Sequence, residues 1–249
     1  MEKLPRKYLP PQLFEKEGVR GCLTILLIAL IMLVVEYYGW QGPYINYVKQ
    51  KMSFFGRPGN EVFFQAQVYT SVSFGIFFFT IPLLFNYFLP LSGTDSNIGL
   101  KLPDWKIAFK DYSPLVLVML PILFFVCMRP GFNQFYPLYR PETLKMLVYY
   151  ELIYLTQFIS VEFFFRGFGV FRLEKLCPGW GAILMVIPYS FVHIHKPFGE
   201  ALCSIIAGLV LGRLSLKTGS IWPGVIVHAC IAVSADLFSL YHAGKLATL

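Results

Sequence analysis

Charged side chains are scarce in this chain of 249 residues. Asp, Glu, Lys and Arg make up 14% of it, against roughly 25% in an average soluble domain. A water-soluble globule of this size could not cover its surface with so few charges, so soluble enzymes and disordered proteins are poor interpretations. The hydrophobic residues, 56% of the chain, occur in long uncharged runs that are typical of helices surrounded by lipid.

Other patterns are absent as well. The five cysteines contain no CxxC pair, so they indicate neither a disulfide framework nor a redox motif. The formal charge is +7, but no basic stripe is interleaved with stacking aromatics, which argues against a nucleic-acid partner. The basic residues instead lie in short loops beside apolar runs, where they set topology and meet anionic lipid.

The apolar runs predict an all-α, polytopic transmembrane helical bundle of about seven spans, with six to eight as the range. They lie at residues 21–38, 62–90, 111–129, 144 onward, 178–192, 201–212 and 218–235. Residues 41–61 leave room for an interfacial helix. Residues 91–111 and 130–143 are expected to be loops, because prolines interrupt them.

Ionisable residues divide the chain into two parts. The first three spans carry almost none, and the last four carry nearly all of them. We therefore predict an amino-terminal tail with three lipid-facing spans over residues 1–143, and a functional core of four helices over residues 144–249. Basic residues before the first run favour a cytoplasmic amino terminus.

Glu162 and Arg166 are four residues apart, so they share one face of a helix. An ionisable side chain at bilayer depth costs at least about 2.5–3.5 kcal/mol, which makes each such residue a functional candidate. One interpretation is a structural ion pair within lipid. The other is that Arg166 holds ionised a carboxylate that acts on a substrate or on water.

The histidines form two further groups. His193 and His195 are two apart and point to different faces of a helix, whereas His228 and Asp236, eight apart, return to nearly the same face. A histidine satisfied by a backbone carbonyl, or a polar contact between helices, is the structural alternative. Glu162 and His193 are equally far from the turn at residues 177–178, which predicts that they lie at matching depth.

These residues, in this order, resemble the motifs of the CPBP family of intramembrane proteases, also called the CAAX-protease or Abi family. The resemblance covers roughly residues 144–240. The family's Glu-Glu-x-x-x-Arg motif corresponds to Val161, Glu162 and Arg166. Its aromatic-x-x-x-His motif corresponds to Tyr189 and His193, although Phe191 and His195 have the same spacing. Its third motif corresponds to His228, with Ala232 where asparagine often stands.

The resemblance implies an integral-membrane endopeptidase of the bacterial inner membrane, multi-pass, that cleaves a membrane-associated peptide or protein substrate. The resemblance leaves open whether that substrate is lipidated. Membrane lipid is the other expected partner. Glu162, assisted by His193, would activate water, and Arg166 would orient Glu162. His228, with His195, would stabilise the oxyanion. Further candidates for the site are Asp236 and Tyr189.

Two departures from the motifs keep alternatives open. Val161 replaces the first glutamate, and Ala232 replaces the asparagine. Both favour a catalytically degenerate relative that acts as a membrane scaffold or maturation factor. A transporter with a proton relay ranks below it, because the chain has no internal repeat.

No cofactor is expected. Zinc held by a Glu/His/His set ranks lower than the metal-free mechanism, because no HExxH motif is present.

Overall fold

The computed structural model describes residues 16–52, 60–91 and 97–249, and these residues form helices joined by short connections, without a β-strand. The all-α prediction is confirmed. In chain order the elements are α1 (Lys16–Val34), η3 (Val35–Gly39), α2 (Gln41–Met52), α3 (Asn60–Phe74), η4 (Gly75–Thr80), α4 (Ile81–Phe88), α5 (Trp105–Val126), α6 (Pro130–Phe135), α7 (Leu144–Glu162), η5 (Phe163–Gly169), α8 (Val170–Leu176), α9 (Gly181–Phe191), α10 (Phe198–Thr218), α11 (Trp222–His242) and η6 (Leu246–Thr248).

Each of the seven apolar runs forms a helix. Five helical segments are long and apolar enough to cross a membrane: Lys16–Lys51, Asn60–Phe88, Trp105–Val126, Phe198–Thr218 and Trp222–His242. The other two runs are α7 with its continuation through η5 and α8, which carries the buried charges, and the shorter apolar helix α9. The chain is thus a helical membrane bundle.

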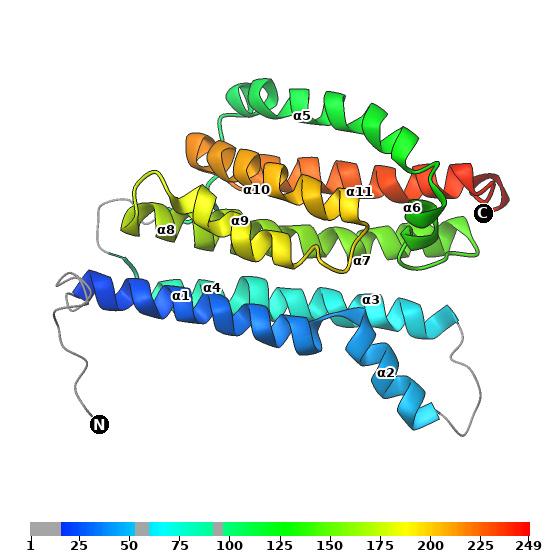
Figure 1. Cartoon of the computed structure of the whole chain (residues 1–249), viewed down its shortest axis with the longest axis horizontal. Helices are drawn as coiled ribbons and strands as arrows, with labels where there is room; N and C mark the ends of the chain where they lie inside the picture. The colour runs from blue at the N-terminus through cyan, green and yellow to red at the C-terminus, as the bar shows by residue number, and fades with distance from the viewer. Residues whose placement is uncertain (1–15, 53–59, 92–96) are drawn as a thin grey trace.

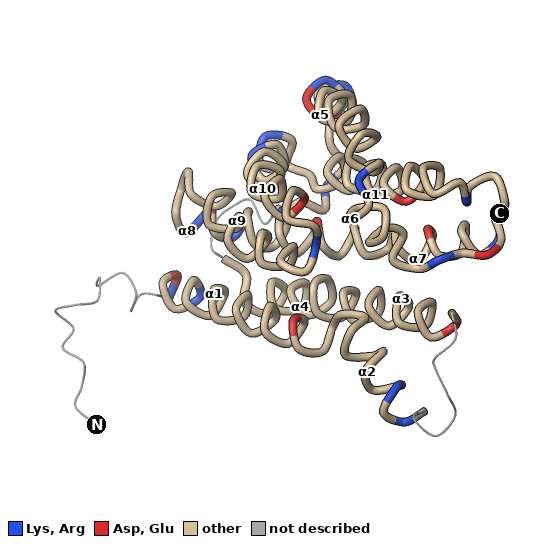
Figure 2. Tube along the Cα trace, turned by 45° about the vertical axis from the view of Figure 1, so that its right-hand side comes forward, with Lys and Arg blue, Asp and Glu red and all other residues tan. Residues whose placement is uncertain are grey.

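The helices lie in layers (Figure 1). On one side lie α1, α3 and α4, with α2 bending away from α1 at an elbow. In the middle lie α7, α8 and α9, and on the opposite side lie α5, α10 and α11. Figure 2 shows that acidic and basic residues gather mostly toward helix ends, while α3 and α4 are nearly free of them. This distribution fits helices whose middle turns face lipid.

An aromatic cluster joins the first layer to the middle one. Phe163, Phe164 and Phe165 in η5 are buried. Phe164 and Phe165 contact Phe78 of η4, and Phe163 contacts Phe79. The rings of Phe78 and Phe164 stack with centroids 4.7 Å apart. Since η4 and η5 are both π-helical, two widened turns pack against each other directly after Glu162. The cluster fixes the end of α7, and with it the carboxylate.

A short segment, residues 97–100, closes the bundle at the start of α11. Ile221 N donates to Gly99 O at 2.8 Å, and Asn97 Nδ2 donates to Gly219 O at 2.7 Å. Gly99 has φ +85°, a conformation that glycine adopts without strain. A Cβ on Gly167 of η5 would lie 2.7 Å from Ile98 O. Backbone therefore packs directly on backbone at this end.

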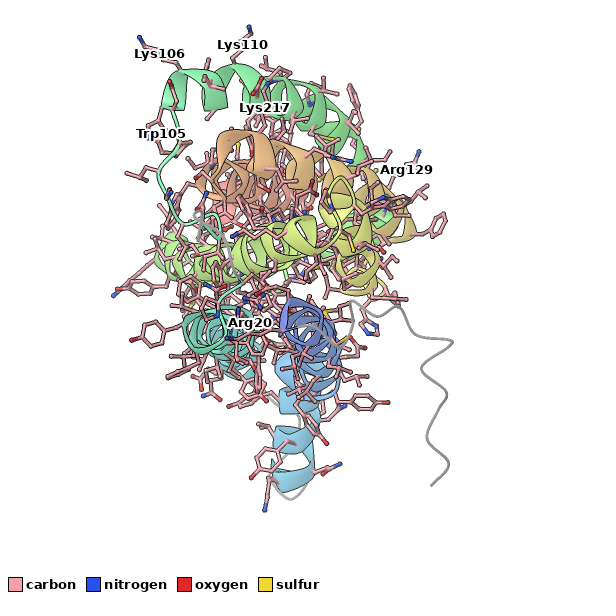
Figure 3. The ribbon with its side chains drawn as sticks, turned by 90° about the vertical axis from the view of Figure 1, so that its left-hand side faces the viewer. Arg20, Trp105, Lys106, Lys110, Arg129 and Lys217 are labelled. Carbon is pink, nitrogen blue, oxygen red and sulfur yellow. The ribbon has the colours of Figure 1, made fainter. Side chains whose placement is uncertain are left out.

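The loops differ in part from the prediction. α5 begins at Trp105, inside the expected loop 91–111, because the Asp104 carboxylate caps it by accepting from Lys106 N at 2.9 Å. The expected loop 130–143 contains the short helix α6, and α2 occupies the predicted interfacial segment. Figure 3 shows Trp105, Lys106 and Lys110 at one end of α5 and Arg129 at the other, pointing away from the bundle, as interfacial anchors do.

Candidate functional site

Glu162 is the centre of a buried polar group. Its side chain is 0% exposed and lies at the end of α7. His228 Nδ1 bonds to Glu162 Oε1 at 3.0 Å, and Arg166 Nη1 lies 3.1 Å from the same oxygen. Glu162 Oε2 has no hydrogen-bond partner among the described residues. It lies against Gly224 of α11, where a Cβ would come within 2.6 Å of it. The absence of a side chain at Gly224 makes room for the carboxylate.

Arg166 balances this carboxylate from within η5. Its side chain is also buried, and the guanidinium carbon lies 3.7 Å from the centre of the Tyr189 ring. Neither terminal nitrogen has a hydrogen-bond partner within the part of the chain that the structure describes. Arg166 is therefore held by the Coulomb attraction of Glu162 and by stacking on Tyr189. The two predicted residues Tyr189 and Arg166 are thus in direct contact.

His228 lies between this buried pair and two cavities. Its ring packs on Phe158 with centroids 4.5 Å apart. Because Nδ1 faces Glu162, the opposite ring edge with Nε2 faces away from it. His228 lines two neighbouring cavities. The first, of about 490 Å³, lies between α5, α6, α10 and α11 and is called the α5 cavity. The second, of about 280 Å³, is called the His193 cavity.

His193 lies in the turn after α9 rather than on the helix, because α9 ends at Phe191. Its Nδ1 bonds to Tyr189 O at 2.9 Å, and its ring meets the Tyr189 ring edge-on at 4.7 Å. His193 and His228 both line the His193 cavity, as does Tyr189. The structure thus brings Glu162, Arg166, Tyr189, His193 and His228 into one continuous group.

Comparison with known proteins bears on the same stretch of chain. Residues 143–234 match the family described as type II CAAX prenyl endopeptidase Rce1-like. Over this segment, which is less than half of the chain, the sequence is similar to that family. No curated protein matches the chain, and no solved structure matches it. The helices before residue 143 lie outside the matched segment.

His195 and Asp236 lie apart from this group. His195 is exposed at the far side of the turn, and its Nε2 bonds to Glu36 Oε1 at 2.7 Å. Asp236 is fully buried two turns along α11 from His228, next to Glu151 and Tyr150 of α7. Neither carboxylate of that pair has a hydrogen-bond partner among the described residues. His195 and His193 thus lie on different sides of the turn after α9. Asp236 lies two helical turns from His228 along α11.

The matched residues 143–234 do not form the α5 cavity alone. Side chains of α5 line it beside His228, and so does Tyr136 after α6. Tyr136 OH donates to Glu200 at 2.8 Å, and Lys196 Nζ donates to Glu200 Oε1 at 2.7 Å. Sequence reasoning did not identify this polar rim. The i, i+4 spacing of Lys196 and Glu200 was the available signal.

No three His, Cys, Asp or Glu side chains come together as metal ligands within residues 16–52, 60–91 and 97–249. The ring nitrogen of His228 nearest Glu162 is already used in the hydrogen bond to that carboxylate. The residues as arranged do not fit a zinc site with three protein ligands.

Proposed function

We propose that the chain is an integral-membrane endopeptidase that cleaves a membrane-associated peptide or protein substrate. One observation carries the proposal: His228 joins a buried carboxylate–guanidinium pair to a cavity large enough for a peptide segment. A histidine oriented by a buried carboxylate is a common arrangement for a general base. The match of residues 143–234 to a CAAX endopeptidase family supports the same reaction class.

In the mechanism we propose, His228 is the general base. An ionised Glu162 only accepts hydrogen bonds, so Nδ1 of His228 carries the hydrogen and Nε2 carries the lone pair. Nε2 takes a proton from water, whose oxygen attacks the substrate carbonyl carbon. The imidazolium is stabilised by Glu162, and it returns the proton to the leaving amine as the C–N bond breaks.

This assignment moves the base from Glu162 to His228. The complete burial of Glu162 favours a positioning role, because water and substrate reach His228 first. His193 is proposed as a second acceptor for the same water. Its Nδ1 donates to a backbone carbonyl, so its Nε2 keeps a lone pair beside the His193 cavity. Arg166 keeps Glu162 ionised.

A non-catalytic relative is the second candidate function. Val161, where the family carries its first glutamate, is 8% exposed and packs in an apolar cluster. That position supplies no carboxylate to the cavities. A scaffold or maturation factor would hold a peptide in the same space without cleaving it.

The deciding experiment is mass mapping of products from membrane-anchored peptides, with purified protein in lipid nanodiscs. Glu162→Gln and His228→Gln should each lower turnover by about 10²–10⁴-fold. His242→Gln is the matched control and should cleave normally, because its ring bonds to Phe124 O at 3.1 Å and lines none of these cavities. Full cleavage by Glu162→Gln would contradict the mechanism. Binding without cleavage by the wild type would favour the scaffold, and Val161→Glu would then be tested for restored cleavage.

A further inference from the structure

A third cavity, of about 470 Å³, lies beneath the elbow between η3 and α2, and we call it the elbow cavity. Its wall comes from the elbow, from α3 and α7, and from the turn that follows α9. The lining residues that matter here are Trp40, Gln41, Gln67, Thr70, Gln157 and Lys196. None of them belongs to the proposed proton-transfer group.

Three hydrogen-bond donors in this wall lack partners. Trp40 Nε1, Gln67 Nε2 and Thr70 Oγ1 are buried without a hydrogen bond to any described residue. Gln67 is 0% exposed and Thr70 is 2% exposed. Buried polar groups are nearly always paired in native proteins, so unpaired donors that share one cavity indicate a ligand with hydrogen-bond acceptors.

Gln67 and Gln157 each form a hydrogen bond with a neighbouring side chain. Gln41 Nε2 donates to Gln67 Oε1, which leaves the Gln67 amide nitrogen as the free donor. Gln157 Nε2 donates to Ser71 Oγ at 2.9 Å, which leaves the Gln157 carbonyl oxygen as an acceptor. The wall therefore offers both N–H donors and a C=O acceptor. This is the complement of a peptide main chain.

The ionisable side chains at the wall already have hydrogen-bond partners. Glu36 bonds to His195 at 2.7 Å, and Lys196 bonds to Glu200 at 2.7 Å. A phosphate group would meet no unpaired cation among these side chains, and it would lie near two carboxylates. A neutral, polar ligand fits the cavity better than an anionic lipid headgroup does.

The elbow cavity adjoins the α5 cavity. Lys196 lines both of them. The α6 region separates the rest of their walls, with Phe132 and Tyr136 on the α5 cavity and Phe135 and Leu138 on the elbow cavity. A peptide bound beside His228 in the α5 cavity would have to pass Lys196 to reach the elbow cavity.

We propose that the elbow cavity binds an uncharged, extended stretch of the substrate peptide, remote from the cleaved bond, through main-chain hydrogen bonds. Trp40, Gln67 and Thr70 would donate to peptide carbonyls, and Gln157 would accept from a peptide N–H. This inference rests on the proposed function, because it takes the ligand to be the substrate of the same site.

The test uses membrane-anchored peptides that are identical around the cleaved bond and are extended stepwise on either side. Their Kd is measured by fluorescence anisotropy in nanodiscs, and kcat/KM is measured by product mass. For wild type, both should improve once the peptide is long enough to reach the elbow cavity. Gln67→Leu and Thr70→Val should each remove about 5-fold of that gain, as expected for one lost hydrogen bond, and leave the shortest peptide unchanged.

Gln65→Leu is the matched control. Gln65 is on the same helix, but its side chain bonds to Tyr44 OH at 3.1 Å on the exposed surface. A Kd that does not depend on peptide length would overturn the inference, whether or not cleavage occurs. The inference would also be overturned if the Kd depends on peptide length to the same degree in wild type, Gln67→Leu and Thr70→Val. A phospholipid retained by wild type and lost from both variants, with peptide Kd unchanged, would assign the cavity to lipid instead.

If the wild type binds long peptides better but cleaves none, the proposed endopeptidase activity fails and the peptide-binding inference stands. If the wild type cleaves normally but its Kd does not depend on peptide length, the endopeptidase proposal stands and the peptide-binding inference fails. The two proposals are therefore separated by one set of peptides and variants.

Discussion

Arg166→Met is the most informative single substitution for stability. It leaves Glu162 fully buried, with only the His228 hydrogen bond at 3.0 Å in place of its ion pair. Removing one partner of a buried pair costs about 3–5 kcal/mol. The lost stacking on Tyr189, at 3.7 Å in the wild type, contributes within that range.

The assay is reversible unfolding in mixed detergent micelles, supported by thermal melts. At roughly 2–4 °C per kcal/mol for a chain of this size, a loss of 3–5 kcal/mol corresponds to about 6–20 °C in Tm. Arg129→Met is the control, because Arg129 points away from the bundle (Figure 3) and should lose little.

The double variant Arg166→Met/Glu162→Leu separates a buried charge from lost packing. Removing both charges should recover at least about 2 kcal/mol of the free energy of unfolding, because no carboxylate is left unpaired. His228 then lacks its partner, so recovery is incomplete. A single Arg166→Met variant within about 1 kcal/mol of wild type would refute the buried pair. A double variant less stable than the single one would refute the electrostatic explanation.

Two further predictions concern the neighbourhood of the site. Gly224→Ala places a Cβ 2.6 Å from Glu162 Oε2, so it should lower the free energy of unfolding by about 1–3 kcal/mol and reduce turnover. Gly75→Ala is the control, because no atom lies within 4 Å of its Cβ. Equal effects of the two substitutions would refute the steric explanation. Asp236→Asn removes one of two adjacent buried carboxyl groups that lack hydrogen bonds. Its free energy of unfolding should be unchanged or higher in the same micelle assay, and a clear fall would show that the charge is needed.

The sequence was sufficient to locate the helices but not to determine which of their side chains contact one another. Long apolar runs define helices strongly, so every predicted run forms a helix, although five segments are long and apolar enough to cross a membrane. The depth argument paired Glu162 with His193 by counting residues along straight helices. In the structure Glu162 bonds to His228, α9 ends at Phe191 before His193, and η5 widens the helix after Glu162. Residue counting does not detect a π-helical turn.

The walls of the cavities were also beyond sequence reasoning. α5 carries no ionisable residue beside His228, so its apolar side chains gave no sign of a functional role. The elbow cavity depends on uncharged Gln67, Thr70 and Gln157, which in sequence look like ordinary helix residues. Such groups become informative only when their missing hydrogen bonds are known.

The backbone contact of residues 97–100 with η5 and α11 has a consequence for the direction of substrate entry. Gly99 and Gly167 bring main chain against main chain, and a peptide strand cannot pass between them. The α5 cavity beside His228, in contrast, is lined by Lys196 and Tyr136. If the proposed substrate enters past these two residues, the chain would act on substrates from one side of the membrane. Its insertion orientation, rather than its chemistry, would decide which side of the membrane it serves.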